Sequence, residues 1–321
     1  MSIVQQLKSA IINGYQVTKA DALMLCGEPL NELCSAANEL REHFCGNAFD
    51  ICTIINGKSG RCSENCKYCA QSGHYCTEVE EYPLLTSDTI LKEANYNHTR
   101  GILRFSIVTS GRNLSDTEMD EVCESYRAIQ ENCDISICAS HGLLSFEQFQ
   151  QLKAAGVSRY HNNLETSRRN FPNICTTHTY DDKIQAIKNA QAAGLAVCSG
   201  GIMGLGETME DRIDMALDIR DLGIKSIPVN ILNPIKGTPF ENLPKLADDE
   251  VRRIIAIFRF ILPDGAVRLA GGRGLLADKG KAAFQSGANA AISGDMLTTS
   301  GISISDDMAM LKDLQFEARL L

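Results

Sequence analysis

Three cysteines in one short stretch restrict this chain more than any other feature. The segment RCSENCKYCAQS, residues 61–72, holds Cys62, Cys66 and Cys69 at C-x3-C-x2-C spacing. Three thiolates on one tight loop can bind three corners of a cubane 4Fe–4S cluster, which leaves the fourth iron without a protein ligand. Such an iron can chelate the amino and carboxylate groups of a small molecule. A zinc site completed by Cys76 is the alternative, although zinc sites favour paired C-x2-C units.

The composition describes a large globular chain. Its 321 residues are 44% hydrophobic, which is enough for one domain with a sizeable core. No apolar run approaches the roughly 18 residues of a membrane span, and the first residues lack the pattern of a secretory signal. We therefore expect a cytoplasmic protein without membrane contact. A net charge of −9 gives no electrostatic basis for nucleic-acid binding, and thirteen cysteines in a reducing compartment favour metal sites over disulfides.

The hydrophobic pattern predicts an α/β fold. Residues 1–46 form a helical lead-in, in which Thr18 and Asp21 resemble a capping box. Eight short apolar runs then alternate with amphipathic segments, at residues 49–55, 103–109, 134–140, 157–164, 195–203, 224–232, 266–272 and 289–295. This alternation predicts a single (β/α)8 TIM barrel over residues 47–321 with an N-terminal helical extension. The three-cysteine loop follows the first run, at the strand end where such barrels carry their chemistry.

Two further strand ends carry polar or glycine-rich sequences. GGIMGLGET, residues 200–208, permits close approach of a nucleoside to the backbone, although glycines also serve in ordinary turns. YHNNLETS, residues 160–167, offers Asn163 and Glu165 two residues apart and hence on one face of a strand. A carboxylate there can accept both hydroxyls of a ribose, and a solvated loop acid is the alternative.

These motifs resemble a known superfamily and, within it, one family. With Tyr68 before its last cysteine, the loop resembles the radical SAM signature, C-x3-C-x-(aromatic)-C. CSENCKYCAQS, HNNLETS, VCSGGIMGLGET, VNILNPIKGTP, VRLAGGR and MLTTSG occur in the order found in biotin synthase, over roughly residues 35–305. The resemblance implies insertion of sulfur into desthiobiotin to give biotin, with S-adenosylmethionine (SAM) as the radical source and a second, auxiliary Fe–S cluster as the sulfur source.

The same resemblance implies roles for individual residues. Cys62, Cys66 and Cys69 would hold the cluster that cleaves SAM, and the SAM contacts would be Tyr68, Asn163, Glu165, Lys183 and Ile202. The substrate contacts would be Asn230, His161, Thr298 and Thr299. Three of these positions depart from the family's usual pattern. Glu165 replaces an Asp, Lys183 replaces an Arg, and His161 replaces an Asn.

The auxiliary cluster also departs from the familiar pattern. Cys138, Cys198 and Arg268 match expected ligands, but Ser106 stands where the second strand usually carries a cysteine. Cys52, on the first strand, is an additional cysteine, and core filling is its alternative role. Cys52, Cys138, Cys198 and Arg268 fall on predicted strands one, three, five and seven, so one interior layer could hold all four, with Ser106 in a neighbouring layer. We expect a four-iron cluster carrying an extra sulfide, with a 2Fe–2S cluster ligated by Arg268 as the alternative.

Other activities and partners remain open at this point. A related radical SAM enzyme, such as a methylornithine synthase or a hydrogenase-cofactor maturase, would share the barrel and the loop cluster. A non-catalytic Fe–S protein would not need the SAM-directed strand ends. The resemblance further implies an electron donor such as flavodoxin or ferredoxin, and a homodimer.

Overall fold

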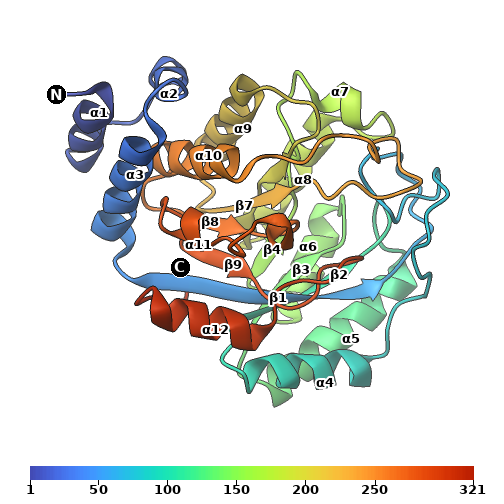
Figure 1. The fold of residues 1–321 in the computed structure, drawn as a ribbon. Helices are drawn as coiled ribbons and strands as arrows, with labels where there is room; N and C mark the ends of the chain where they lie inside the picture. The colour runs from blue at the N-terminus through green and yellow to red at the C-terminus, as the bar shows by residue number, and fades with distance from the viewer.

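The barrel is closed and entirely parallel (Figure 1). The computed structural model describes residues 1–321. Neighbouring strands pair in chain order around the barrel, and β9 returns to pair with β1. The strands are β1 (Ala48–Lys58), β2 (Arg104–Thr109), β3 (Ser136–Ser140), β4 (Arg159–His161), β5 (Ala196–Cys198), β6 (Gly201–Met203), β7 (Ser226–Ile231), β8 (Ala266–Leu269) and β9 (Ala290–Ile292). The predicted (β/α)8 barrel is therefore confirmed.

Helices cover the outside of the barrel (Figure 1). They are α4 (Ser87–His98), α5 (Asp116–Asn132), α6 (Phe146–Ala154), α7 (Phe171–Ile174), α8 (Tyr180–Ala192), α9 (Met209–Asp221), α10 (Asp248–Ile261), α11 (Lys281–Phe284) and α12 (Ile304–Asp313), with the short 3-10 turn η1 (Arg273–Leu275). Capping boxes open α5, α6, α8 and α9. Gly156 and Gly194 follow α6 and α8 with positive φ, which ends each helix before the next strand.

Three helices precede the barrel. They are α1 (Ile3–Ile12), α2 (Lys19–Leu25), which begins with the predicted Thr18–Asp21 capping box, and α3 (Leu30–Cys45). α3 packs against α10, and its Cys34 and Cys45 are buried beside main-chain oxygens of Arg252 and Pro263. These two cysteines act as small buried side chains. None of the helices has the length and apolar character needed to cross a membrane.

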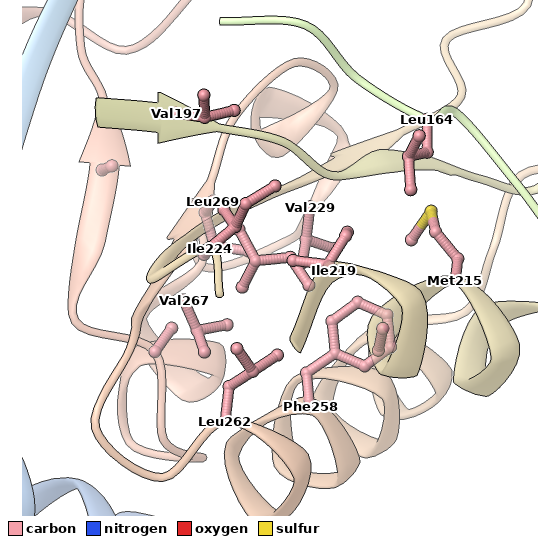
Figure 2. Packing of buried hydrophobic residues seen from close by; sticks show 14 of the residues in the cluster. Leu164, Val197, Met215, Ile219, Ile224, Val229, Phe258, Leu262, Val267 and Leu269 are labelled. Atoms are coloured by element: carbon pink, nitrogen blue, oxygen red, sulfur yellow. The ribbon is translucent and has the colours of Figure 1, made fainter. Parts of the chain in front are cut away.

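The hydrophobic core behind strands β5 to β8 is continuous with helices α9 and α10. Figure 2 shows Ile219 of α9 and Phe258 of α10 packed towards Val229 of β7 and Val267 of β8, while Met215 of α9 points towards Leu164. All of these side chains are fully buried. Close packing on this side holds the ends of these strands in fixed positions around the barrel mouth.

The fifth strand position is broken, whereas the sequence predicts one strand over residues 195–203. β5 ends at Cys198, and β6 begins at Gly201 and pairs with β7. The cause is close backbone approach at Gly200, where a Cβ atom would lie 1.9 Å from the carbonyl oxygen of Pro228. Only glycine fits there without a shift of the neighbouring backbone, and both β5 and β6 still pair with β7.

Candidate active site

A cavity of about 410 Å³ opens at the carboxyl ends of the barrel strands. It combines nearly all of the predicted site residues, and its lining as a whole draws on every strand position of the barrel. Its lining includes Cys52, Cys62, Tyr68, Cys69, Cys138, His161, Asn163, Glu165, Cys198, Ile202, Asn230, Arg268, Thr298 and Thr299. Cys66 and Lys183 lie outside this lining.

The three-cysteine loop is closed by its own backbone. The Cys62 N–H donates to the oxygen of Gln71 (3.0 Å), and the Cys69 N–H donates to the oxygen of Cys66 (3.0 Å). Burial raises the pKa of the Cys69 thiol to about 11, so this group loses its proton only to a strong Lewis acid such as iron. A compact loop of three soft thiol donors fits a 4Fe–4S cluster with one open iron.

A hydrogen-bonded row leads from β3 to the predicted ribose contacts. Burial lowers the pKa of His161 to about 4, so its ring is neutral at ordinary pH. Its Nε2 lies 2.8 Å from Asn163 Oδ1, and its Nδ1 lies 3.2 Å from the Ser140 hydroxyl. Asn163 Nδ2 donates in turn to Glu165 Oε2 (3.4 Å). Both ring nitrogens of His161 therefore have partners within the protein, and its predicted substrate contact stays a prediction.

Asn163 and Glu165 lie together, but not because of strand alternation. β4 already ends at His161, and Glu165 has a positive φ of 70°. The break between β5 and β6 fixes this pair, because Gly200 N–H donates to Asn163 Oδ1 (3.1 Å) and Gly200 O accepts from Glu165 N–H (3.0 Å). Ile202 N–H then donates to Glu165 O (2.9 Å). Burial raises the pKa of the Glu165 carboxyl, which Lys183 partly offsets.

The remaining predicted SAM and substrate contacts differ in how many of their polar atoms already have partners within the protein. Lys183, in the first turn of α8, donates to Asn162 Oδ1 (3.1 Å) behind the row. Asn230 donates to Gly201 O (3.1 Å) and accepts from Gly271 N–H (2.9 Å). An amide has two N–H groups and two lone pairs, so Asn230 keeps one of each for a ligand.

The predicted auxiliary ligands face one another in the lower part of the cavity. Cys52 Sγ lies 3.1 Å from Arg268 Nη1, and Cys138 and Cys198 line the same cavity. Burial raises the pKa of the Cys52 thiol to about 12, although the Arg268 charge opposes this. Three thiols without any disulfide fit an iron–sulfur centre.

Ser106 lies on β2, next to β3. Its backbone pairs in register with Cys138, and its side chain lines the same cavity. The hydroxyl is buried and has no hydrogen-bond partner within the protein. A group buried without a partner is costly, so Ser106 Oγ is available to a bound group.

The cavity floor contains charged residues that the sequence did not single out. Asp50 is fully buried, two residues before Cys52. Its carboxylate contacts Arg104 (3.0 Å), Arg159 (3.4 Å) and Arg268 (3.2 Å). Burial by itself would raise the pKa of Asp50, but these guanidiniums outweigh it and hold the pKa at about 2. One carboxylate among three cations leaves the floor net positive, which suits an anionic cluster.

A second missed group lies behind the three-cysteine loop. Cys66 Sγ lies 3.7 Å from Cys175 Sγ, which also meets His178 Nδ1 at 3.3 Å. The donor atoms of these three residues lie within 4.8 Å of one another. No spacing motif announces Cys175, because 109 residues separate it from Cys66 and only the fold brings them together.

Family models and curated relatives cover this whole arrangement. Residues 58–219 match the model "Radical SAM superfamily", and residues 228–317 match "Biotin and Thiamin Synthesis associated domain". Among curated proteins, the chain is 63% identical over 320 residues to "Biotin synthase" of Akkermansia muciniphila, with all of both chains covered. It is 59% identical to "Biotin synthase" of Clostridium botulinum, covering 99% of this chain and all of the relative.

Solved structures show the same fold at much lower identity. Methylornithine synthase matches with a TM-score of 0.84 at 19% identity, covering 98% of this chain and 97% of that one. The FeFe-hydrogenase maturase of Carboxydothermus hydrogenoformans matches with a TM-score of 0.83 at 17% identity, covering 98% and 78%. The two alternative enzymes thus share the barrel alone. The full-length relatives decide the family, and the chain belongs to the biotin synthase family of radical SAM enzymes.

Proposed function

We propose that the chain converts desthiobiotin to biotin, using SAM as the radical source and an auxiliary cluster as the sulfur source. One observation carries this proposal: a single cavity joins a three-cysteine loop at its mouth to three further cysteines at its floor. When bound, the loop cluster supplies the electron that cleaves SAM to a 5′-deoxyadenosyl radical, and the auxiliary cluster supplies the sulfur. The protein would hold both clusters along one cavity.

SAM would lie against the loop and the ends of β4 and β6. Cys62, Cys66 and Cys69 would hold the loop cluster, with Tyr68 and Ile202 beside the nucleoside. Asn163 and Glu165 would bind the ribose hydroxyls, and the row from Ser140 through His161 supports this role by orienting Asn163. His161 thus becomes a positioning residue. Lys183 would have to leave Asn162 to reach the SAM carboxylate.

Desthiobiotin would lie between the two clusters. Asn230 keeps one donor and one acceptor free, which matches the N–H and C=O groups of a cyclic urea. Thr298 and Thr299 line the cavity on the loop after β9 and would meet the carboxylate tail.

For the auxiliary cluster we propose Cys52, Cys138 and Cys198 as thiolate ligands, with Arg268 as a charged neighbour. Arg268 Nη1 donates to Asp50 O (2.9 Å), Cys52 Sγ (3.1 Å) and Ala291 O (3.0 Å). Although burial opposes it, the negative partners raise the pKa of Arg268 further. A protonated guanidinium has no lone pair to offer iron. Three protein ligands favour a four-iron cluster that carries an exogenous sulfide over a 2Fe–2S cluster ligated by Arg268.

Membership of the family supports a proposal for the cellular setting. We propose a cytoplasmic homodimer that receives electrons from a flavodoxin or a ferredoxin.

Anaerobic turnover of the reconstituted protein tests the function. With SAM, a strong reductant and desthiobiotin, we expect biotin together with 5′-deoxyadenosine and methionine, measured by mass spectrometry. Cys66→Ala should form neither biotin nor 5′-deoxyadenosine, because a cubane that loses one of three thiolates cannot keep its open iron in place. Release of 5′-deoxyadenosine without biotin would instead indicate another radical SAM substrate, and absence of both from the wild-type protein would contradict the proposal.

A further inference from the structure

The segment after α7 is tied to the three-cysteine loop by several hydrogen bonds. Lys67 N–H donates to Ile174 O (2.9 Å), and Asn65 N–H donates to Thr177 Oγ1 (3.1 Å). In return, Asn65 Oδ1 accepts from Thr176 N–H (2.9 Å). These contacts come from both sides of Cys66 and Cys175. The two cysteines are therefore held opposite each other by hydrogen bonds of their chain neighbours.

Besides Cys66, three polar atoms lie near the Cys175 thiol. Cys175 is 2% exposed as a residue, so water does not compete for its sulfur. Thr177 Oγ1 lies 3.5 Å from Cys175 Sγ, but it already accepts from Asn65 N–H and donates to Glu64 Oε2. Asn65 Oδ1 lies 3.4 Å from Cys175 Sγ, but that oxygen already accepts from the N–H groups of Thr176 and Thr177. His178 Nδ1 lies 3.3 Å away, but it faces Glu64 Oε2 at 2.5 Å. Since a carboxylate oxygen accepts, Nδ1 carries the hydrogen and cannot accept from Cys175.

We infer that Cys175 donates an S–H hydrogen bond to the iron-bound sulfur of Cys66 and thereby raises the reduction potential of the loop cluster. The inference rests on the proposed function, in which Cys66 ligates iron. A thiol that coordinates a metal is deprotonated, so Cys66 can only accept and Cys175 must be the donor. The 3.7 Å separation between the two sulfurs allows this bond.

The direction of the effect follows from charge. Reduction adds one negative charge to the cluster and its thiolates. A hydrogen bond to a ligating sulfur stabilises this added charge, and such bonds are among the protein's means of setting Fe–S potentials. Removing the donor should therefore make the cluster harder to reduce. Cys175 is a positioning residue in this sense, since it acts on the cluster only through Cys66.

An EPR-monitored redox titration tests the inference on the full reconstituted chain. The signal followed is the one that changes when SAM is added, so that the auxiliary cluster does not interfere. Cys175→Ala should shift the midpoint of this signal to a lower potential at unchanged cluster content. Cys175→Ser keeps a donor and should return part of the shift, whereas Cys175→Val keeps the volume without a donor and should not. Cys123→Ala removes a buried thiol in α5, far along the chain from the loop, and should leave the midpoint unchanged.

The outcomes distinguish failure of the proposed function from failure of the inference about Cys175. A wild-type chain without any SAM-responsive signal would contradict the proposed function itself. An intact signal whose midpoint is the same in wild type and Cys175→Ala would overturn the inference alone. So would recovery in Cys175→Val but not in Cys175→Ser, because packing would then be the cause.

Discussion

Cys52 has an environment that prepares a buried thiol for iron. Burial disfavours its thiolate, but Arg268 Nη1 lies 3.1 Å away and the floor beneath is net positive. A buried thiol of this kind stays protonated and unreactive until a metal replaces the proton. In the proposed assignment, this location lets one side chain be inert in the cluster-free chain and act as a ligand when the cluster forms.

Replacing Cys52 by Ser should remove the auxiliary cluster selectively. We expect lower iron and sulfide content at that site and no biotin, because an unionised hydroxyl binds iron poorly. Cleavage of SAM to 5′-deoxyadenosine should continue, since Cys62, Cys66 and Cys69 are untouched. Iron and sulfide analysis, Mössbauer spectra and product assays measure these effects.

Ser106→Ala serves as the comparison and should change cluster content little. Retention of full auxiliary iron and full biotin yield in Cys52→Ser would disprove the assignment.

Some site residues are visible in the sequence and others are not. The loop cysteines follow from spacing, and strand parity leads to Cys52, which the cavity lining includes. Asp50 and Arg159 lie at inward-facing positions of their strands. The alternation of residues along a strand does not by itself show whether such charges are buried together or exposed. The position of Cys175 beside Cys66 could not be predicted, because 109 positions of sequence separate the two residues. The position of Glu165 depends on a positive φ that no propensity assigns to glutamate.

At the level of elements, the break between β5 and β6 organises the side of the cavity where we propose that SAM binds. It lets Gly200 bind Asn163 and Glu165 through its backbone, while β6 pairs with β7. The apolar run at residues 195–203 predicts a strand but not its interruption, because the interruption arises from contact with Pro228 on a later strand.

A methyl group at Gly200 should disturb this break. In Gly200→Ala the new Cβ would lie 1.9 Å from Pro228 O, and we expect a loss of about 1–3 kcal/mol in the free energy of unfolding from overpacking. SAM affinity should fall as well, because Asn163 and Glu165 would shift. Urea unfolding and equilibrium dialysis with labelled SAM measure the two effects.

Gly27→Ala is the matched control for this change, since the nearest atom to its Cβ would be 4.0 Å away. Equal stability and SAM affinity in both variants would show that the close approach at Gly200 has no consequence.

On the scale of the whole molecule, the floor connects distant parts of the chain. Asp50 on β1 joins arginines from β2, β4 and β8. The short strand β10 (Glu317–Ala318) pairs with the beginning of β1, and the main-chain oxygen of Leu321 accepts from Arg104 (3.2 Å) and Arg159 (2.7 Å). One buried carboxylate thus ties four segments together at the base of the barrel.

Asp50→Asn should weaken the whole fold. Removing one partner from a buried ionic network costs about 3–5 kcal/mol, and urea unfolding at neutral pH should show this loss. Because the folded pKa of Asp50 is depressed to about 2 from 3.8, its contribution is present above about pH 4 and is lost as the pH falls towards 2. The difference between wild type and Asp50→Asn should shrink over that range.

Asp264→Asn removes a carboxylate from an exposed pair with Lys225 and should change stability little. A difference between wild type and Asp50→Asn that is small at neutral pH, or that grows on acidification, would argue against this role of Asp50.

β1 also runs from one proposed cluster site to the other. It carries Cys52 near its base and runs to Lys58, four residues before Cys62. At about 3.3 Å per residue, the stretch from Cys52 to Lys58 spans about 20 Å. β9 pairs with the beginning of this stretch at Cys52, and β2 pairs with it as far as Lys58 across an irregularity between Asn56 and Lys58. In the proposed assignment, the length of this one paired strand therefore sets how far the sulfur source lies from the radical source, and with it the size of molecule that can reach both.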